Sequence, residues 1–154
     1  MVLTRGLFHP IFINGNTWHN NSLIDACILP QRIMSKKILI LDDDTDILEI
    51  LSLILVDSGY EVRTLSCGNT VFEDIKEFHP DLVLMDVMLA DMDGRTICKD
   101  IKQNDLTCLV PVILISGTHD LAESLHSPGG PNDFIAKPFN ITQLLERIEK
   151  QLAA

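Results

Sequence analysis

The sequence predicts an α/β fold in which helices cover both faces of a parallel sheet. Short apolar runs such as "ILIL" and "LVLM" do not alternate with polar residues, as expected of strands that are buried on both faces. Stretches with helical spacing of apolar residues follow most of these runs. Strand-like and helix-like segments alternate from Lys37 to Leu152, which is typical of parallel strands joined by helical crossovers.

The expected elements follow one another along the chain. Strands are expected at residues 38–41, 60–65, 81–86, 110–116 and 133–136, and helices at 45–59, 69–79, 93–103 and 140–152. The first helix has an apolar face of Ile47, Leu48, Leu51 and Leu55, a cap at Asp44 or Thr45, and Gly59 at its end. The last helix has Asn140 as its cap and Gln143 in the capping-box position.

The segment between the fourth and fifth strands is irregular. "SPGGP" places Pro128, Gly129, Gly130 and Pro131 where a helix would be expected to end. Proline lacks a backbone donor and glycine is entropically costly in a helix. We therefore expect a short helix near Asp120–His126, followed by a mobile loop to Asn132.

Composition narrows the classes of function. The chain has 154 residues, of which 46% are hydrophobic, enough for one domain with a core. The net charge of −10 argues against nucleic acid as a direct partner, because phosphate binding needs clustered cations. No apolar run approaches the length of a membrane span. The four cysteines form no C-x-x-C pair and are interpreted as free thiols of a cytoplasmic protein.

Residues 1–34 differ from the rest of the chain. They include two prolines and the polar patch "INGNTWHNN", and their apolar residues show no sustained period. They are interpreted as an N-terminal extension, either disordered or an over-long start assignment, before a domain at 35–154. A docking arm built on Leu7, Phe8, Ile11 and Phe12 remains an alternative.

Polar side chains that could bind a ligand or take part in a reaction lie where the expected strands end. Asp42 and Asp43 follow the first strand, Asp86 ends the third, Ser116 ends the fourth, and Lys137 follows the fifth. Ligands of open parallel sheets bind outside the carboxyl ends of the strands. Carboxylates gathered there are expected to surround a hard divalent cation, with Mg²⁺ the best candidate.

These residues, taken in order, resemble the receiver domain of two-component response regulators. The matching pieces are "LILDDD", "DLVLMDVML", "MDG", "VILIS" and "DFIAKPF", and they cover most of the chain after the N-terminal segment. The resemblance implies a flavodoxin-like, doubly wound sheet of five parallel strands in the order 2-1-3-4-5. The usual proline four residues after the family's acceptor aspartate is replaced here by Ala90.

The resemblance also implies residue roles. Asp86 would accept a phosphoryl group from a sensor histidine kinase or a histidine phosphotransfer protein. Asp43, Asp86, the backbone carbonyl of Met88 and, through water, Asp42 would hold Mg²⁺. Lys137 and Ser116 would contact the phosphoryl oxygens, the Lys137–Pro138 peptide would be cis, and Phe134 would be an aromatic switch that follows Ser116.

The leading hypothesis is a stand-alone receiver that signals to a downstream protein by altered interaction. In this hypothesis the chain is not an enzyme beyond its own phosphotransfer and autodephosphorylation. One alternative is a receiver-like module that binds partners without phosphorylation. Another is a phosphatase of the haloacid dehalogenase type, but that family's D-x-D-x-T/V motif would have Asp46 at its last position.

Overall fold

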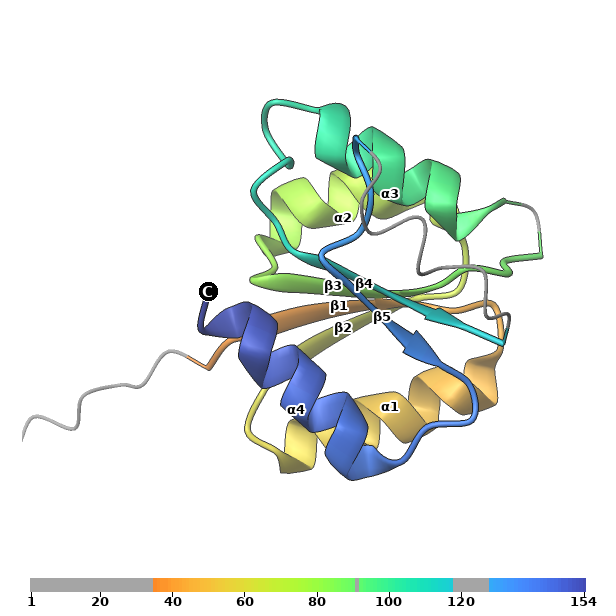
Figure 1. Cartoon of the computed structure of the whole chain (residues 1–154), viewed down its shortest axis with the longest axis vertical. Helices are drawn as coiled ribbons and strands as arrows, with labels where there is room; N and C mark the ends of the chain where they lie inside the picture. The colour runs from red at the N-terminus through yellow and green to blue at the C-terminus, as the bar shows by residue number, and fades with distance from the viewer. Residues whose placement is uncertain (1–34, 91, 118–127) are drawn as a thin grey trace, which may run out of the picture. The chain divides into compact units, whose positions relative to one another are not determined.

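The computed structural model describes residues 35–90, 92–117 and 128–154. Its five parallel strands form one sheet in the order β2-β1-β3-β4-β5, which confirms the expected architecture (Figure 1). The strands are β1 (Lys37–Leu41), β2 (Glu61–Leu65), β3 (Leu82–Asp86), β4 (Val112–Ser116) and β5 (Asp133–Ala136). The described helices are α1 (Thr45–Asp57), α2 (Val71–Phe78), α3 (Gly94–Gln103) and α4 (Ile141–Leu152), with a 3-10 turn, η1 (Gly68–Thr70), before α2.

The sheet separates two apolar cores. Helices α1 and α4 cover one face and α2 and α3 the other (Figure 1). Alternate residues of each central strand enter opposite cores: Leu39 and Leu41 pack on the α2–α3 side, and Ile38 and Ile40 on the α1–α4 side. Strands β1, β3 and β4 are almost wholly buried, as their unbroken apolar runs predict.

Helix caps agree with the sequence, with small differences in the bounds. The Asp44 side chain accepts hydrogen bonds from the N–H groups of Asp46 and Ile47, and Asn140 accepts one from Gln143. Strand β4 begins at Val112 rather than at residue 110, directly after Pro111, which has no N–H group to donate. Helix α2 starts later than expected because η1 forms its first turn.

The end of the "SPGGP" segment is tied to β4. Gly129 has a φ of +82°, a conformation that glycine adopts without strain. Asn132 donates its N–H to the carbonyl of Val112, and its side chain accepts the N–H of Val112. The helix expected near residues 120–126 and the N-terminal extension lie outside the described residues. The mobility expected up to Asn132 stays a prediction.

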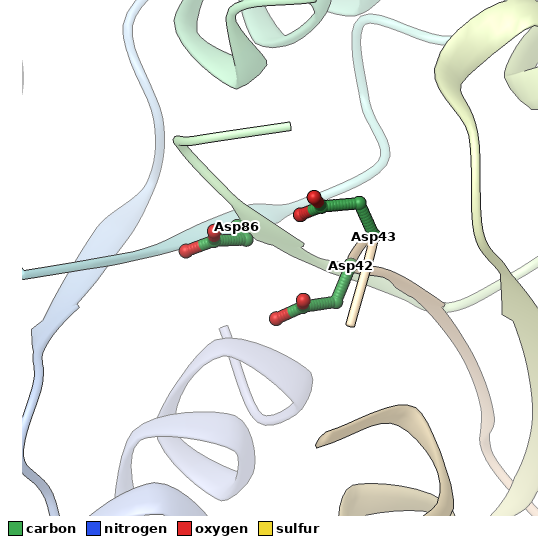
Figure 2. A group of neighbouring side chains, drawn as sticks. All are labelled: Asp42, Asp43 and Asp86. Carbon is green, nitrogen blue, oxygen red and sulfur yellow. The ribbon is translucent and has the colours of Figure 1, made fainter. Parts of the chain in front are cut away.

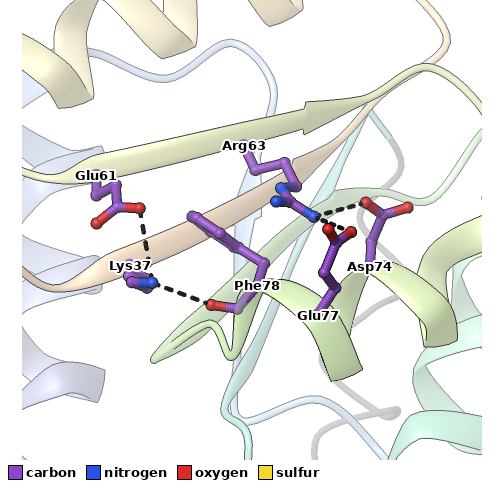
Figure 3. Close-up of polar contacts among 6 residues, drawn as sticks. All are labelled: Lys37, Glu61, Arg63, Asp74, Glu77 and Phe78. Atoms are coloured by element: carbon purple, nitrogen blue, oxygen red, sulfur yellow. Dashed lines mark hydrogen bonds and ion pairs between the residues drawn. The ribbon is translucent and has the colours of Figure 1, made fainter.

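Charged side chains and one aromatic ring join β1 and β2 to α2 on the α2–α3 face of the sheet. Phe78 lies between Lys37, whose Nζ is 5.0 Å from the ring centroid, and Arg63, whose Cζ is 4.7 Å away (Figure 3). Arg63 also pairs with Asp74 at 3.1 Å and Glu77 at 3.0 Å. These contacts join β1, β2 and α2 around one ring. None of the helices described in this structure is both long and apolar enough to cross a membrane.

Candidate functional site

Three carboxylates converge where the two central strands end. Asp42 and Asp43 directly follow β1, Asp86 is the last residue of β3, and β1 and β3 are hydrogen-bonded neighbours. One oxygen of each side chain lies within 4.8 Å of the others (Figure 2). The parallel sheet therefore creates the cluster, because the carboxyl ends of β1 and β3 lie side by side and each apolar run is followed there by an acidic residue.

Asp42 is buried and held in place from both sides. Its side chain is almost fully covered, its N–H donates to the carbonyl of Leu65 at 3.2 Å, and its Oδ1 accepts the N–H of Asp44 at 2.9 Å. Its other oxygen, Oδ2, is buried without a hydrogen-bond partner among the described residues. Lys137 Nζ is 3.5 Å from Oδ2, an ion-pair separation that is too long for a good hydrogen bond.

Burial has the largest influence on the acidity of Asp42. Removal from water raises the pKa of this carboxyl group above its ordinary value, and the nearby charge of Asp86 adds to the rise. The Asp44 N–H and the Lys137 ammonium oppose the shift but do not cancel it. The charged form of Asp42 is thus under-compensated by the protein's own groups.

Lys137 is the cation of the site. Its Nζ lies 3.1 Å from Asp86 Oδ1, and its backbone N–H donates to the Ser116 carbonyl at 2.7 Å, so β4 fixes its position. The Lys137–Pro138 peptide is cis, as the resemblance implied.

The donor set fits a divalent cation. Three carboxylates facing one ammonium leave an excess of two negative charges when all are ionised. Hard oxygen ligands with this charge suit Mg²⁺, and Asp42 Oδ2, which has no hydrogen-bond partner among the described residues, offers a direct ligand or an acceptor for a metal-bound water.

The acids of "DDDTD" divide into different roles. Asp43 is exposed at the rim of the cluster, whereas Asp44 caps α1 and Asp46 lies in its first turn. Both positions match the dipole of the helix, whose N-terminal end favours acidic side chains. Met88 follows β3 and forms an isolated bridge with Asp93. Its carbonyl as a metal ligand stays a prediction.

Ser116 and Phe134 lie on the neighbouring strands. Ser116 is the last residue of β4, fully buried, next to Ala136 in the β4–β5 register. Phe134 is half-buried in β5 and packs against the core on the α2–α3 side. Both are where the sequence predicted them, and their roles as switch residues stay predictions.

Two residues that support the site received no role from the sequence. The Asp93 side chain accepts the Arg95 N–H at 2.8 Å and caps α3. Gly94 donates its N–H to the Val87 carbonyl, and a Cβ at this position would clash with the backbone oxygen of Asp86. The pair "DG" is visible in the sequence, but its contact with the end of β3 depends on how α3 packs.

Comparison with known proteins agrees with this geometry. A family model described as the response regulator receiver domain matches residues 38–149. The chain belongs to the response regulator receiver domain family. The DNA-binding response regulator MtrA of Mycolicibacterium paratuberculosis is 31% identical over 119 residues, which make up 77% of this chain and 52% of the relative. The receiver thus spans about half the length of this curated relative.

Solved receiver structures superpose on the chain. A CheY-like response regulator receiver domain protein from Methanospirillum hungatei is 33% identical, with a TM-score of 0.70 over 77% of this chain and 94% of that one. TrrA from Thermotoga maritima, solved in complex with Mg²⁺-BeF, is 26% identical, with a TM-score of 0.67 over 75% of this chain and 98% of that one. The expected fold class is therefore confirmed.

Proposed function

We propose that this receiver accepts a phosphoryl group on Asp86 from a phosphohistidine of a sensor kinase or a histidine phosphotransfer protein. The observation that carries the proposal is the clustering of Asp86 with Asp42 and Asp43 beside the Lys137 ammonium, which is 3.1 Å from Asp86 Oδ1. A nucleophile, a cation and two further acids at the carboxyl ends of neighbouring strands match the needs of phosphoryl transfer.

In the proposed reaction an Asp86 carboxylate oxygen attacks phosphorus. The bond from phosphorus to the donor histidine nitrogen breaks, and its electron pair returns to the imidazole. Lys137 stabilises negative charge on the phosphoryl oxygens, and the Ser116 hydroxyl donates a hydrogen bond to another of them. Hydrolysis of the resulting acyl phosphate releases phosphate and restores Asp86. This self-limited chemistry is a switch cycle and not turnover of a separate substrate.

Asp42, Asp43, Asp86 and the Met88 carbonyl would hold Mg²⁺ in this cycle. When bound, the ion neutralises charge on the phosphoryl oxygens in transit. The buried Asp42 Oδ2, which lacks a hydrogen-bond partner among the described residues, supports this assignment. The Mg²⁺-BeF complex of TrrA gives it a precedent within the family.

We propose that the receiver acts in the cytoplasm and passes its signal to a downstream protein, with no membrane or nucleic acid contacted directly by the receiver. The acidic net charge of −10 supports this proposal. MtrA is described as DNA-binding, but this chain matches only about half of its length. Action as a stand-alone receiver stays a prediction for the same reason.

Acetyl phosphate with Mg²⁺ tests the assignment without knowledge of the donor protein. We expect one modified residue, Asp86, when the acyl phosphate is trapped and mapped by mass spectrometry. Asp86→Asn should abolish labelling. Asp81→Asn, in the residue before β3 at the opposite end of that strand, should retain it.

Two outcomes would contradict the proposal. Label on Asp42, Asp43 or a serine would move the acceptor away from Asp86. A wild-type chain that binds Mg²⁺ and folds, yet takes no label from acetyl phosphate or from histidine donors, would support the alternative of a receiver-like module that works without phosphorylation.

A further inference from the structure

The loop between α3 and β4, residues 104–111, has a shape fixed by its own hydrogen bonds. The Asn104 side chain accepts the Leu106 N–H at 2.9 Å, and the buried Thr107 hydroxyl donates to the Ile101 carbonyl at 2.7 Å. Lys102 extends from α3 and donates to the Val110 carbonyl at 2.6 Å. Residues carried by this loop are therefore presented in a defined position rather than on a loose tether.

The loop carries two leucines whose side chains are exposed to solvent. Leu106 is 87% exposed and Leu109 is 92% exposed. Their side chains contribute almost no burial to the fold, although a leucine gains roughly 1.5–3 kcal/mol when it is fully buried. Apolar side chains that are grouped on a rigid surface often mark an interface.

A groove lies beside the loop, and Leu106 forms part of its wall. Its volume is about 550 Å³, and its walls include Phe72, Ile75 and His79 of the α2 segment and Leu106 and Val110 of the loop. Helix α2 ends just before β3 begins, and the loop ends just before β4 begins. The groove thus lies at the amino ends of the strands, opposite the carboxylate cluster.

We infer that this face binds a second copy of the chain about a two-fold axis. A two-fold interface joins one surface patch to itself, so the patch needs both a protrusion and a hollow. Leu109, which is exposed and directly precedes the groove residue Val110, is the protrusion, and the groove is the hollow: Leu109 of each copy enters the groove of the other.

Charges on the same face favour this pairing. Lys76 lines the groove, and Asp105 is exposed next to Leu106 on the loop. Among the described residues, neither forms an ion pair within its own chain. The two-fold operation brings the loop of one copy to the groove of the other, so that each Asp105 faces a Lys76. Both carboxylate clusters stay open to a phosphoryl donor, and the inference does not depend on the proposed phosphorylation.

Sedimentation velocity of the full chain over a wide concentration range tests the inference. The buffer should hold about 0.15 M salt, so that the long-range repulsion due to the net charge is screened. We expect a concentration-dependent dimer whose dissociation constant rises at least tenfold in Leu109→Ser. Leu53→Ser removes another exposed leucine, 72% exposed on α1, and should leave the dimer unchanged.

A charge exchange identifies the contact itself. Lys76→Glu and Asp105→Lys should each weaken the dimer, and the double variant should recover most of the lost affinity. A wild-type chain that stays monomeric at all concentrations would overturn the inference and leave the groove to a different partner. A dimer that responds to Leu53→Ser but not to Leu109→Ser would also overturn it. Thermal melts verify that each variant is folded.

Discussion

Asp42 is a buried carboxylate whose charged form is only partly compensated by the groups around it. One of its oxygens is satisfied by the Asp44 N–H, while the other has no hydrogen-bond partner among the described residues. Burial raises its pKa, and Asp86 adds like charge nearby. The residue is therefore better suited to a cation-bound state than to the metal-free one.

We expect Asp42→Asn to melt a few degrees above the wild type at neutral pH without Mg²⁺. The wild type loses stability as pH rises from the ordinary value of 3.8 through the raised pKa of folded Asp42, because the unfolded chain binds fewer protons over that interval. Asparagine does not titrate, so the variant does not undergo this loss. The difference in melting temperature between variant and wild type should therefore vanish at pH values below that interval. Melting curves over a pH series measure it.

Millimolar Mg²⁺ should reverse this order. A ligand that binds the folded state raises its stability by mass action, and the variant lacks part of the site. The exposed capping residue Asp44 provides the control: Asp44→Asn retains a cap and should keep the wild-type response to Mg²⁺. An equal Mg²⁺ shift in Asp42→Asn and the wild type would remove Asp42 from the site.

At the scale of elements, the close contact between α3 and the end of β3 decides where Asp86 lies. Gly94 begins α3, and its missing side chain lets the helix start against the backbone of Asp86 and Val87. Asp93 caps the same helix, and its pairing with Arg95 lowers its pKa. The nucleophile of the proposed reaction is thus positioned by the helix that follows it as well as by its own strand.

Gly94→Ala should destabilise the fold by about 1–3 kcal/mol, because the new Cβ would clash with the backbone oxygen of Asp86 and force a shift. Labelling of Asp86 by acetyl phosphate should fall as the strand end moves. Chemical denaturation and the labelling rate measure the two effects.

Gly117→Ala is the matched control for stability, since a Cβ there meets nothing within 4 Å. It should remain close to the wild type in denaturation. A Gly94→Ala variant as stable as this control would show that α3 can shift away from β3 without cost.

Sequence alone predicted the elements because each has a local cause. The unbroken apolar runs indicate buried strands, and Asp44 and Asn140 mark helix starts by side-chain capping. The clash that a side chain at Gly94 would cause is not local: it depends on how α3 sits on β3. The division between buried Asp42 and exposed Asp43 also depends on the strand's orientation in the assembled sheet. The residues next to Asp42 and Asp43 in the sequence do not specify which of the two is buried.

For the molecule as a whole, the two cores on either side of the sheet are expected to hold the receiver together without residues 1–33. Those residues lie outside the described part of the chain, and their composition lacks a periodic apolar face. A chain of residues 34–154 should match the full chain in melting temperature and in labelling of Asp86.

A lower melting temperature of the shortened chain would contradict this prediction and favour the docking arm that contains Leu7, Phe8, Ile11 and Phe12. Replacing Phe8 and Phe12 by serine in the full chain would separate the two cases. These changes should alter nothing if the extension is dispensable, and should reproduce the loss if the extension packs on the domain.

The contacts of Arg63 bear on how the protein behaves when crowded. An edge strand offers unpaired backbone groups to which another chain can add a strand, the first step towards cross-β aggregates. Arg63 of the edge strand β2 pairs with Asp74 and Glu77 and lies against the Phe78 ring, and these contacts fasten the strand to α2 (Figure 3). A strand that is fastened in this way is less free to leave its own sheet and exchange with the sheet of a neighbouring molecule.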